Sequence, residues 1–221
     1  AHPMQEIADI IENEKGVLIT ITQGGSEDLY QSLAASRVGD LYLPGSASYR
    51  EKHLQEGLLG DFVHIGYNQA ALMVPKGNPK KITNDLREMT RKDLAVVIAD
   101  AGTGSIGRET KRILQQAGLY EEVMKNAVFL TTDSRNLNRA LREGEADLIL
   151  NWRATAFFEE NRQVMDVLDI SDELANPKKL LINQLVFTRH PEISRYVMDY
   201  AMSEKGQAIF GKYGFIAAPK D

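Results

Sequence analysis

Helical and strand-like patterns of apolar residues alternate along the chain. Met4, Ile7 and Ile11 recur at the three- and four-residue spacing of an amphipathic helix that begins after Pro3. Apolar runs such as residues 17–22 are too short for helices and predict buried strands. Further strands are predicted at residues 40–43, 62–75 (with a bend near Gly66), 94–99, 128–131, 147–151, 164–170 and 180–188, and further helices at residues 85–89, 106–117, 134–141, 191–202 and 205–212, with two more that start at Ser26 and at Ser46 or Ser48.

This alternation of strands and helices is typical of an α/β protein with a sheet rich in parallel strands. Two breakers, Gly77-Asn78-Pro79 and Asn176-Pro177, each lie beside an apolar run. We therefore expect the chain to cross twice between two domains. The first domain is discontinuous and consists of residues 1–77 and 184–221, and the second consists of residues 78–183.

Composition and charge narrow the class of protein. The chain has 221 residues, and its 26 Lys and Arg against 31 Asp and Glu give a formal net charge of −5. This acidic balance argues against nucleic acid as the main partner, because proteins that bind polyanions usually carry a basic excess. The longest charge-free stretch, Phe62 to Pro75, is shorter than the about 20 residues of a membrane-spanning helix. The absence of cysteine excludes disulfides and thiolate metal sites.

Four loops each follow a predicted strand and begin a predicted helix. Their backbone N–H groups and small hydroxyl side chains are suited to an anion, because the start of a helix carries partial positive charge. A single serine at a helix start is usually only a cap, and Ser26 and Ser134 are both predicted to be N-caps. Four such loops favour an anion site. The loops are Gly24-Gly25-Ser26, Gly102-Thr103-Gly104-Ser105, Thr131-Thr132-Asp133-Ser134 and Asn151-Trp152-Arg153.

Enzyme motifs are poorly represented. Gly102 to Gly107 satisfies G-x-G-x-x-G, but no acidic residue ends the next strand at the dinucleotide-binding distance, so the motif predicts a tight turn that can approach an anion. There is no P-loop, and Gly24 to Asp28 does not complete a G-x-S-x-G elbow. The histidines His2, His53, His64 and His190 lack metal-ligand spacing. The sequence predicts a binding protein with no catalytic residues, cofactor or metal.

The order of five short stretches resembles that of the periplasmic molybdate- and tungstate-binding proteins, which belong to the type II solute-binding superfamily. The similarity covers nearly the whole chain, and it is more specific for the superfamily than for the ligand. The stretches are Gly24-Gly25-Ser26, Gly39-Asp40-Leu41-Tyr42-Leu43-Pro44-Gly45-Ser46, Leu72-Met73-Val74-Pro75-Lys76-Gly77-Asn78-Pro79, Leu141-Arg142-Glu143-Gly144-Glu145-Ala146-Asp147-Leu148 and Phe210-Gly211-Lys212-Tyr213-Gly214-Phe215.

The resemblance implies a type II periplasmic-binding fold, in which each of two lobes is a mixed sheet flanked by helices and the ligand binds between the lobes. By position, Ser26 would donate a hydrogen bond from the first lobe, and Ser134 and the loop after Gly102 would contribute backbone donors from the second. Trp152 stands where these proteins usually have a ligand-contacting tyrosine, and Arg153 adds a positive charge. The candidate ligand-binding residues are Gly25, Ser26, Thr103, Gly104, Ser105, Ser134, Asn151, Trp152 and Arg153.

The function implied is that of an extracytoplasmic solute-binding protein of an ABC importer. Such a protein would be a monomer in the periplasm or outside the cell, free or lipid-anchored, and would carry a tetrahedral oxyanion similar to molybdate or tungstate to the membrane subunits. Phosphate, a phosphonate and a small carboxylate are alternative ligands. An effector-binding domain of a LysR-type regulator and a sensor ectodomain are alternative roles for the same fold. The family's first strand, with a serine-bearing loop, would precede or include Ala1-His2-Pro3.

Overall fold

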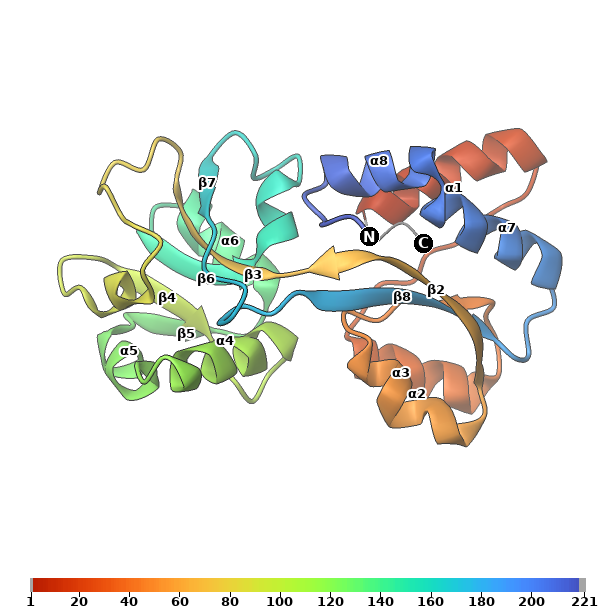
Figure 1. Ribbon diagram of the computed structural model, residues 1–221, viewed down its shortest axis with the longest axis horizontal. Helices are drawn as coiled ribbons and strands as arrows, with labels where there is room; N and C mark the ends of the chain where they lie inside the picture. The colour runs from red at the N-terminus through yellow and green to blue at the C-terminus, as the bar shows by residue number, and fades with distance from the viewer. Residues whose placement is uncertain (1, 219–221) are drawn as a thin grey trace. The chain divides into compact units, whose positions relative to one another are not determined.

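The computed structural model describes residues 2–218 and divides into two compact units (Figure 1). Unit 1 comprises Ala1–Asn68 and Lys178–Asp221, and unit 2 comprises Gln69–Pro177. The fold class is α/β as predicted, because each unit contains one sheet flanked by helices. No helix in the described part of the chain is long and apolar enough to cross a membrane.

Unit 1 is built on an antiparallel sheet with the strand order β1-β8-β2. The helices α1, α7 and α8 cover one face of this sheet, and α2 and α3 cover the other (Figure 1). The strands are β1 (Leu41–Tyr42), β2 (Leu59–Asn68) and β8 (Lys178–Leu185), and the helices are α1 (His2–Lys15), α2 (Ser26–Ser36), α3 (Ser48–His53), α7 (Pro191–Met202) and α8 (Glu204–Lys212), with a 3-10 turn at Leu54–Glu56.

Unit 2 is built on a mixed sheet with the strand order β5-β4-β6-β3-β7. β4 is parallel to both of its neighbours, whereas β3 is antiparallel to β6 and to β7. The strands are β3 (Ala70–Pro75), β4 (Val96–Ala99), β5 (Phe129–Thr131), β6 (Leu148–Trp152) and β7 (Met165–Leu168), and the helices are α4 (Ser105–Gln116), α5 (Tyr120–Asn126) and α6 (Ser134–Arg142), with 3-10 turns at Leu86–Thr90 and Arg153–Phe157.

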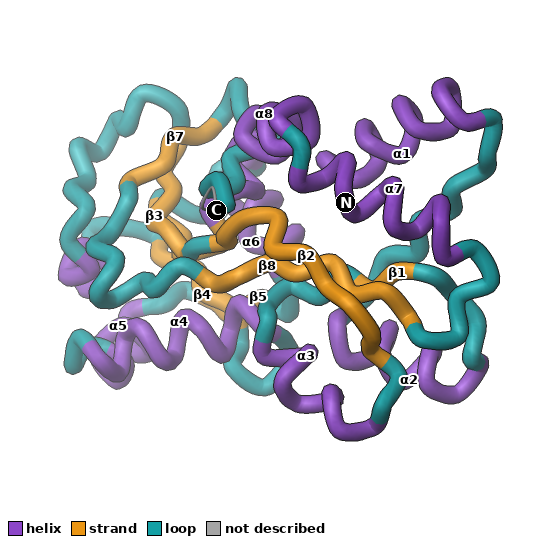
Figure 2. The backbone as a smooth tube through the Cα atoms, turned by 45° about the vertical axis from the view of Figure 1, so that its right-hand side comes forward, coloured by secondary structure: helices purple, strands orange, loops and turns teal. Residues whose placement is uncertain are grey.

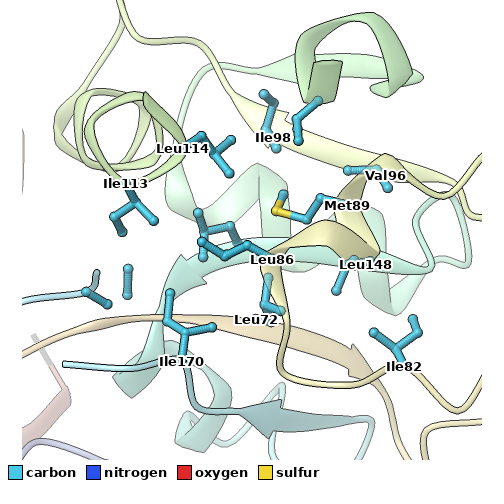
Figure 3. Close-up of a cluster of buried hydrophobic side chains, with 14 of the residues drawn as sticks. Leu72, Ile82, Leu86, Met89, Val96, Ile98, Ile113, Leu114, Leu148 and Ile170 are labelled. Atoms are coloured by element: carbon cyan, nitrogen blue, oxygen red, sulfur yellow. The ribbon is translucent and has the colours of Figure 1, made fainter. Parts of the chain in front are cut away.

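Alternation along β4 buries both faces of the unit 2 sheet. Val96 and Ile98 point to the side of α4, where they meet Ile113 and Leu114 (Figure 3). Val97 and Ala99 point to the opposite side, where α6 packs. A strand buried on both faces is a continuous apolar run, and this is why its sequence shows no polar alternation.

The predicted strand at residues 62–75 is in fact two strands in two sheets. β2 ends at Asn68 in unit 1, and β3 begins at Ala70 in unit 2. The tube in Figure 2 follows the chain directly from β2 into β3. The crossings therefore lie at residues 68/69 and 177/178 and differ from the predicted 77/78 and 183/184. The breaker Gly77-Asn78-Pro79 follows β3, which already belongs to unit 2. It therefore marks the end of a strand and not the crossing between the units.

Residues 17–22, which were predicted to be a strand, are extended but pair with no strand among the described residues. Their side chains alternate: Val17 and Ile19 pack on the core of unit 1, whereas Leu18 is 87% exposed. The one backbone hydrogen bond recorded in this segment runs from the N–H of Ile19 to Glu12 Oε1, at 2.7 Å. The prediction of a buried strand is therefore wrong here, because a strand requires a neighbour to pair with and residues 17–22 are half-buried or exposed.

We expect the backbone amides of Leu18 and Thr20 to exchange with solvent much faster than that of Ile182, because Ile182 lies in β8, between two other strands. Native-state hydrogen exchange followed by NMR measures this directly. Protection at Thr20 equal to that in β8 would contradict the description and would require a strand partner for residues 17–22.

Candidate functional site

The parallel strands of unit 2 bring three of the predicted anion-binding loops to one edge of its sheet. β5 and β6 both run parallel to β4, so the carboxyl ends of all three strands lie at the same edge. The loops after β4 and β5 are tied together, because Thr103 Oγ1 donates to the backbone carbonyl of Thr132 at 2.9 Å. Ligands of α/β sheets bind outside this edge, where connections leave toward opposite faces, as α4 and α6 do here.

The start of α4 is the best-formed anion-suited group in unit 2. Gly104 is its N-cap residue, and the first turn contains no acidic side chain. The first N–H groups of a helix have no intrahelical acceptor, so those that follow Gly104 are available to a ligand. Thr103 has a structural part in the loop, since its hydroxyl also donates to the carbonyl of Asp100 at 3.0 Å. Ser105 is exposed, and no acceptor for its hydroxyl is recorded among the described residues.

Gly107 explains why the turn after β4 is rich in glycine. A Cβ at this position would lie 1.9 Å from the carbonyl oxygen of Asp100. The helix α4 therefore packs directly on the end of β4, as the last glycine of a G-x-G-x-x-G pattern permits. The motif serves a tight strand-to-helix turn in this chain, as the sequence predicts.

Ser134 and Asn151 contact one another, and their side chains are engaged inside unit 2. Asn151 is fully buried; its amide group donates to the Ser134 carbonyl and to Asn138 Oδ1, both at 3.0 Å. Its carbonyl oxygen accepts from Ser134 Oγ and from the Trp152 N–H, both at 2.8 Å. Ser134 is not the N-cap of α6, because Asp133 occupies that position and accepts from the Asn136 N–H. The Asp133 side chain precedes the first helical residue and reaches the N–H of Asn136, three residues ahead, as an N-cap side chain does.

Trp152 and Arg153 follow each other at the end of β6. Trp152 is the last residue of the strand and is half-buried against both cores of unit 2. The charge of Arg153 is paired within the protein, because its Nε donates to Asp169 Oδ1 at 2.8 Å, and its guanidinium lies over the ring of Phe157. The positive charge at this edge is thus balanced by a protein carboxylate.

In unit 1, Ser26 lies against a second small-residue loop. Gly25, not Ser26, is the N-cap residue of α2, and Ser26 is the first helical residue. Its Oγ accepts a hydrogen bond from the Gly45 N–H at 3.0 Å. Its carbonyl accepts from the Tyr42 hydroxyl at 2.6 Å, and burial raises the pKa of Tyr42. The hydroxyl proton of Ser26 has no acceptor recorded in residues 2–218 and is available to a ligand.

The loop beside Ser26, Pro44 to Ser48, was not among the predicted site residues. Ser46 Oγ lies 2.8 Å from Ser48 Oγ and accepts from the Ser48 N–H at 3.1 Å, just before α3 begins. The signal for it was present in the sequence, as two serines and a glycine directly after the short strand at residues 40–43. Its pairing with Ser26 is a tertiary contact, which that pattern alone does not show.

A metal site finds no support in the described residues, since no three His, Asp or Glu side chains gather as a metal would require. The uncharged hydroxyl and backbone N–H groups at the starts of α2 and α4 are instead hydrogen-bond donors. They are suited to an anion and not to a cation.

The family of bacterial extracellular solute-binding proteins matches residues 1–216 of the chain. The chain belongs to this family. A binding protein of Haemophilus influenzae is 22% identical over 221 residues, which cover 98% of this chain and 86% of that protein.

Solved structures of solute-binding proteins share the fold at low sequence identity. The substrate-binding domain of a molybdenum ABC transporter from Clostridium difficile has a TM-score of 0.80 at 15% identity, over 98% of this chain and 94% of that one. The periplasmic molybdate-binding protein of Azotobacter vinelandii has a TM-score of 0.79 at 13% identity, over 99% and 95%. A periplasmic thiamin-binding protein has a TM-score of 0.77 at 16% identity, over 100% and 80%. The shared fold thus serves ligands of different charge.

We expect Gly107→Ala to destabilise unit 2 by about 2 kcal/mol or more, because overpacking against backbone forces α4 away from β4. Gly211→Ala is the matched control: Gly211 also lies in a helix, but nothing lies within 4 Å of its Cβ position. There the change should stabilise by roughly 0.5–1 kcal/mol, as alanine usually does in a helix. Chemical denaturation measures both. A neutral or stabilising Gly107→Ala would show that α4 does not approach Asp100 so closely.

Proposed function

We propose that this protein binds a small oxyanion without chemically changing it and delivers it to the membrane subunits of an ABC importer outside the cytoplasm. The observation that carries the proposal is the pair of helix starts, α2 at Ser26 and α4 at Ser105, that offer uncharged hydrogen-bond donors. Membership of the extracellular solute-binding family supports transport over the effector-domain and sensor alternatives.

The chemistry of the donors favours a fully ionised tetrahedral oxyanion such as molybdate or tungstate. Hydroxyl and backbone N–H groups can surround such an ion without a counter-charge, because they make charge-assisted hydrogen bonds to it. A carboxylate or a phosphonate is more often held by a bidentate guanidinium. The guanidinium of the candidate residue Arg153 is bound to Asp169.

A ligand screen tests the proposal. Molybdate, tungstate, sulfate, phosphate, methylphosphonate and acetate are each added to ligand-free protein, and thiamin serves as a cationic control. A ligand at 100 times its dissociation constant should stabilise the native state by about 2.7 kcal/mol, which a thermal shift detects. Trp152 is the only tryptophan, so its fluorescence reports on the end of β6 alone and should change with the same midpoint as calorimetry.

Stabilisation by thiamin and by no anion would refute the oxyanion assignment while leaving a solute-binding role. Stabilisation by phosphonate or acetate alone would shift the assignment to the alternative ligands. Recovery of the ligand in altered form would contradict binding without chemistry.

Ser26→Ala should weaken binding of the anion by about 1.5–3 kcal/mol, the value of a hydrogen bond to a charged group, and should lower stability by about 1 kcal/mol, because the bond from Gly45 is lost. Ser203→Ala is the control, since Ser203 Oγ likewise accepts a backbone N–H at a helix start in unit 1, from Gly206 at 3.1 Å. It should cost similar stability and leave affinity unchanged. Calorimetry measures affinity and chemical denaturation measures stability, so together they separate the two effects. Equal affinities in the two variants would limit Ser26 to a structural role.

A further inference from the structure

A buried histidine joins the first turn of α2 to the end of α3. His53 is only 4% exposed, and its ring stacks on Tyr30 with 3.6 Å between the ring centroids. Its Nε2 lies 2.9 Å from Glu27 Oε2, and its Nδ1 lies 2.8 Å from Glu56 Oε2. Figure 1 shows α2 and α3 side by side, below the sheet of unit 1. Both ring nitrogens therefore lie within hydrogen-bond distance of a carboxylate oxygen.

Both carboxylate oxygens of Glu27 contact other side chains. Besides His53, Lys52 Nζ lies 3.2 Å from Oε2, and Gln31 Nε2 donates to Oε1 at 2.9 Å. The hydrogen bond from His53 is the largest of the causes that lower the pKa of Glu27 to about 2. Glu27 is therefore a carboxylate at neutral pH, and all its recorded partners are side chains.

The contacts of Glu27 bear on anion binding because of where this residue lies in the helix. It directly follows Ser26, in the first turn of α2. An acidic side chain in the first turn is attracted to the unpaired N–H groups of its own helix, where it occupies the place that an external anion would take. Its negative charge also repels an anion nearby. Here the carboxylate is bound to α3 instead.

We infer that His53 is a positioning residue for anion binding: by binding Glu27, it keeps that carboxylate off the N–H groups at the start of α2 and leaves them, with Ser26, to the ligand. The inference rests on the proposed function. It also gives a reason for Glu27 beside this donor group, where a carboxylate free to approach the N–H groups would oppose anion binding.

Asp28 provides an internal comparison. It lies in the same turn, and its carboxylate is 3.4 Å from the Cβ position of Gly25. No hydrogen bond between Asp28 and His53 is recorded in the described residues. Asp28 and Glu27 thus carry the same charge in the same turn, but only Glu27 is bound by the histidine.

The test measures the affinity of the best-binding oxyanion of the screen, at constant pH and ionic strength, together with stability. His53→Phe retains an aromatic ring to stack on Tyr30 and removes both ring nitrogens, including the one that contacts Glu27. It should weaken binding roughly three- to tenfold, the range that one freed charge near a helix start produces. Adding Glu27→Gln should restore affinity to within about twofold of wild type, because the competing carboxylate is gone. Stability should not recover, since Glu27→Gln makes no new bond to the phenyl ring.

Asp28→Asn in the His53→Phe background is the matched control and should restore affinity less than Glu27→Gln does. His53→Gln, with a neutral donor, serves if the phenylalanine variant does not fold, and it should show a smaller loss with the same rescue. Unchanged affinity in the folded His53 variants, no rescue by Glu27→Gln, or equal rescue by Asp28→Asn would each overturn the inference while oxyanion binding by the wild-type protein stands. Failure of the wild-type protein to bind any oxyanion would overturn the proposed function itself.

Discussion

Parallel pairing of β4 with β5 on one side and β6 on the other is the constraint on which the candidate site of unit 2 depends. It sends the loops after these strands to one edge of the sheet and the connecting helices to its two faces. The start of α4 then lies where α/β sheets generally bind ligands. Gly107 makes this placement possible, because any larger residue would collide with the carbonyl of Asp100.

Two charged side chains at the candidate residues are paired inside the protein. Arg153 is paired with Asp169 in unit 2, and Glu27 is bound by His53 and Lys52 in unit 1. Such pairing leaves uncharged hydrogen-bond donors for the proposed ligand. In the proposed function these neutral donors bind an anion through charge-assisted hydrogen bonds, without a fixed counter-charge.

The helix starts that form the candidate site were visible in the sequence, and the errors in their caps have physical causes. The small residues after the predicted strands correctly indicated where α2, α4 and α6 begin. The N-caps of α2 and α6, however, are Gly25 and Asp133, one residue earlier than predicted. A capping serine and a serine in the first turn look alike in a sequence, since both precede the apolar period. Asn151, predicted as a ligand contact, has all its hydrogen-bonding capacity used by Ser134, Asn138 and Trp152, which no local pattern reveals.

The sequence by itself determined the α/β class, most of the elements and the resemblance to solute-binding proteins, because apolar periodicity and turn residues act over a few neighbouring positions. Only the tertiary structure decided which strands pair. It divided the run at residues 62–75 between two sheets and left residues 17–22 extended without a partner. It also joined His53 to Glu27 across 26 positions of the chain. Pairing and burial depend on segments far apart in sequence, and the free energy that selects them is that of the whole folded unit.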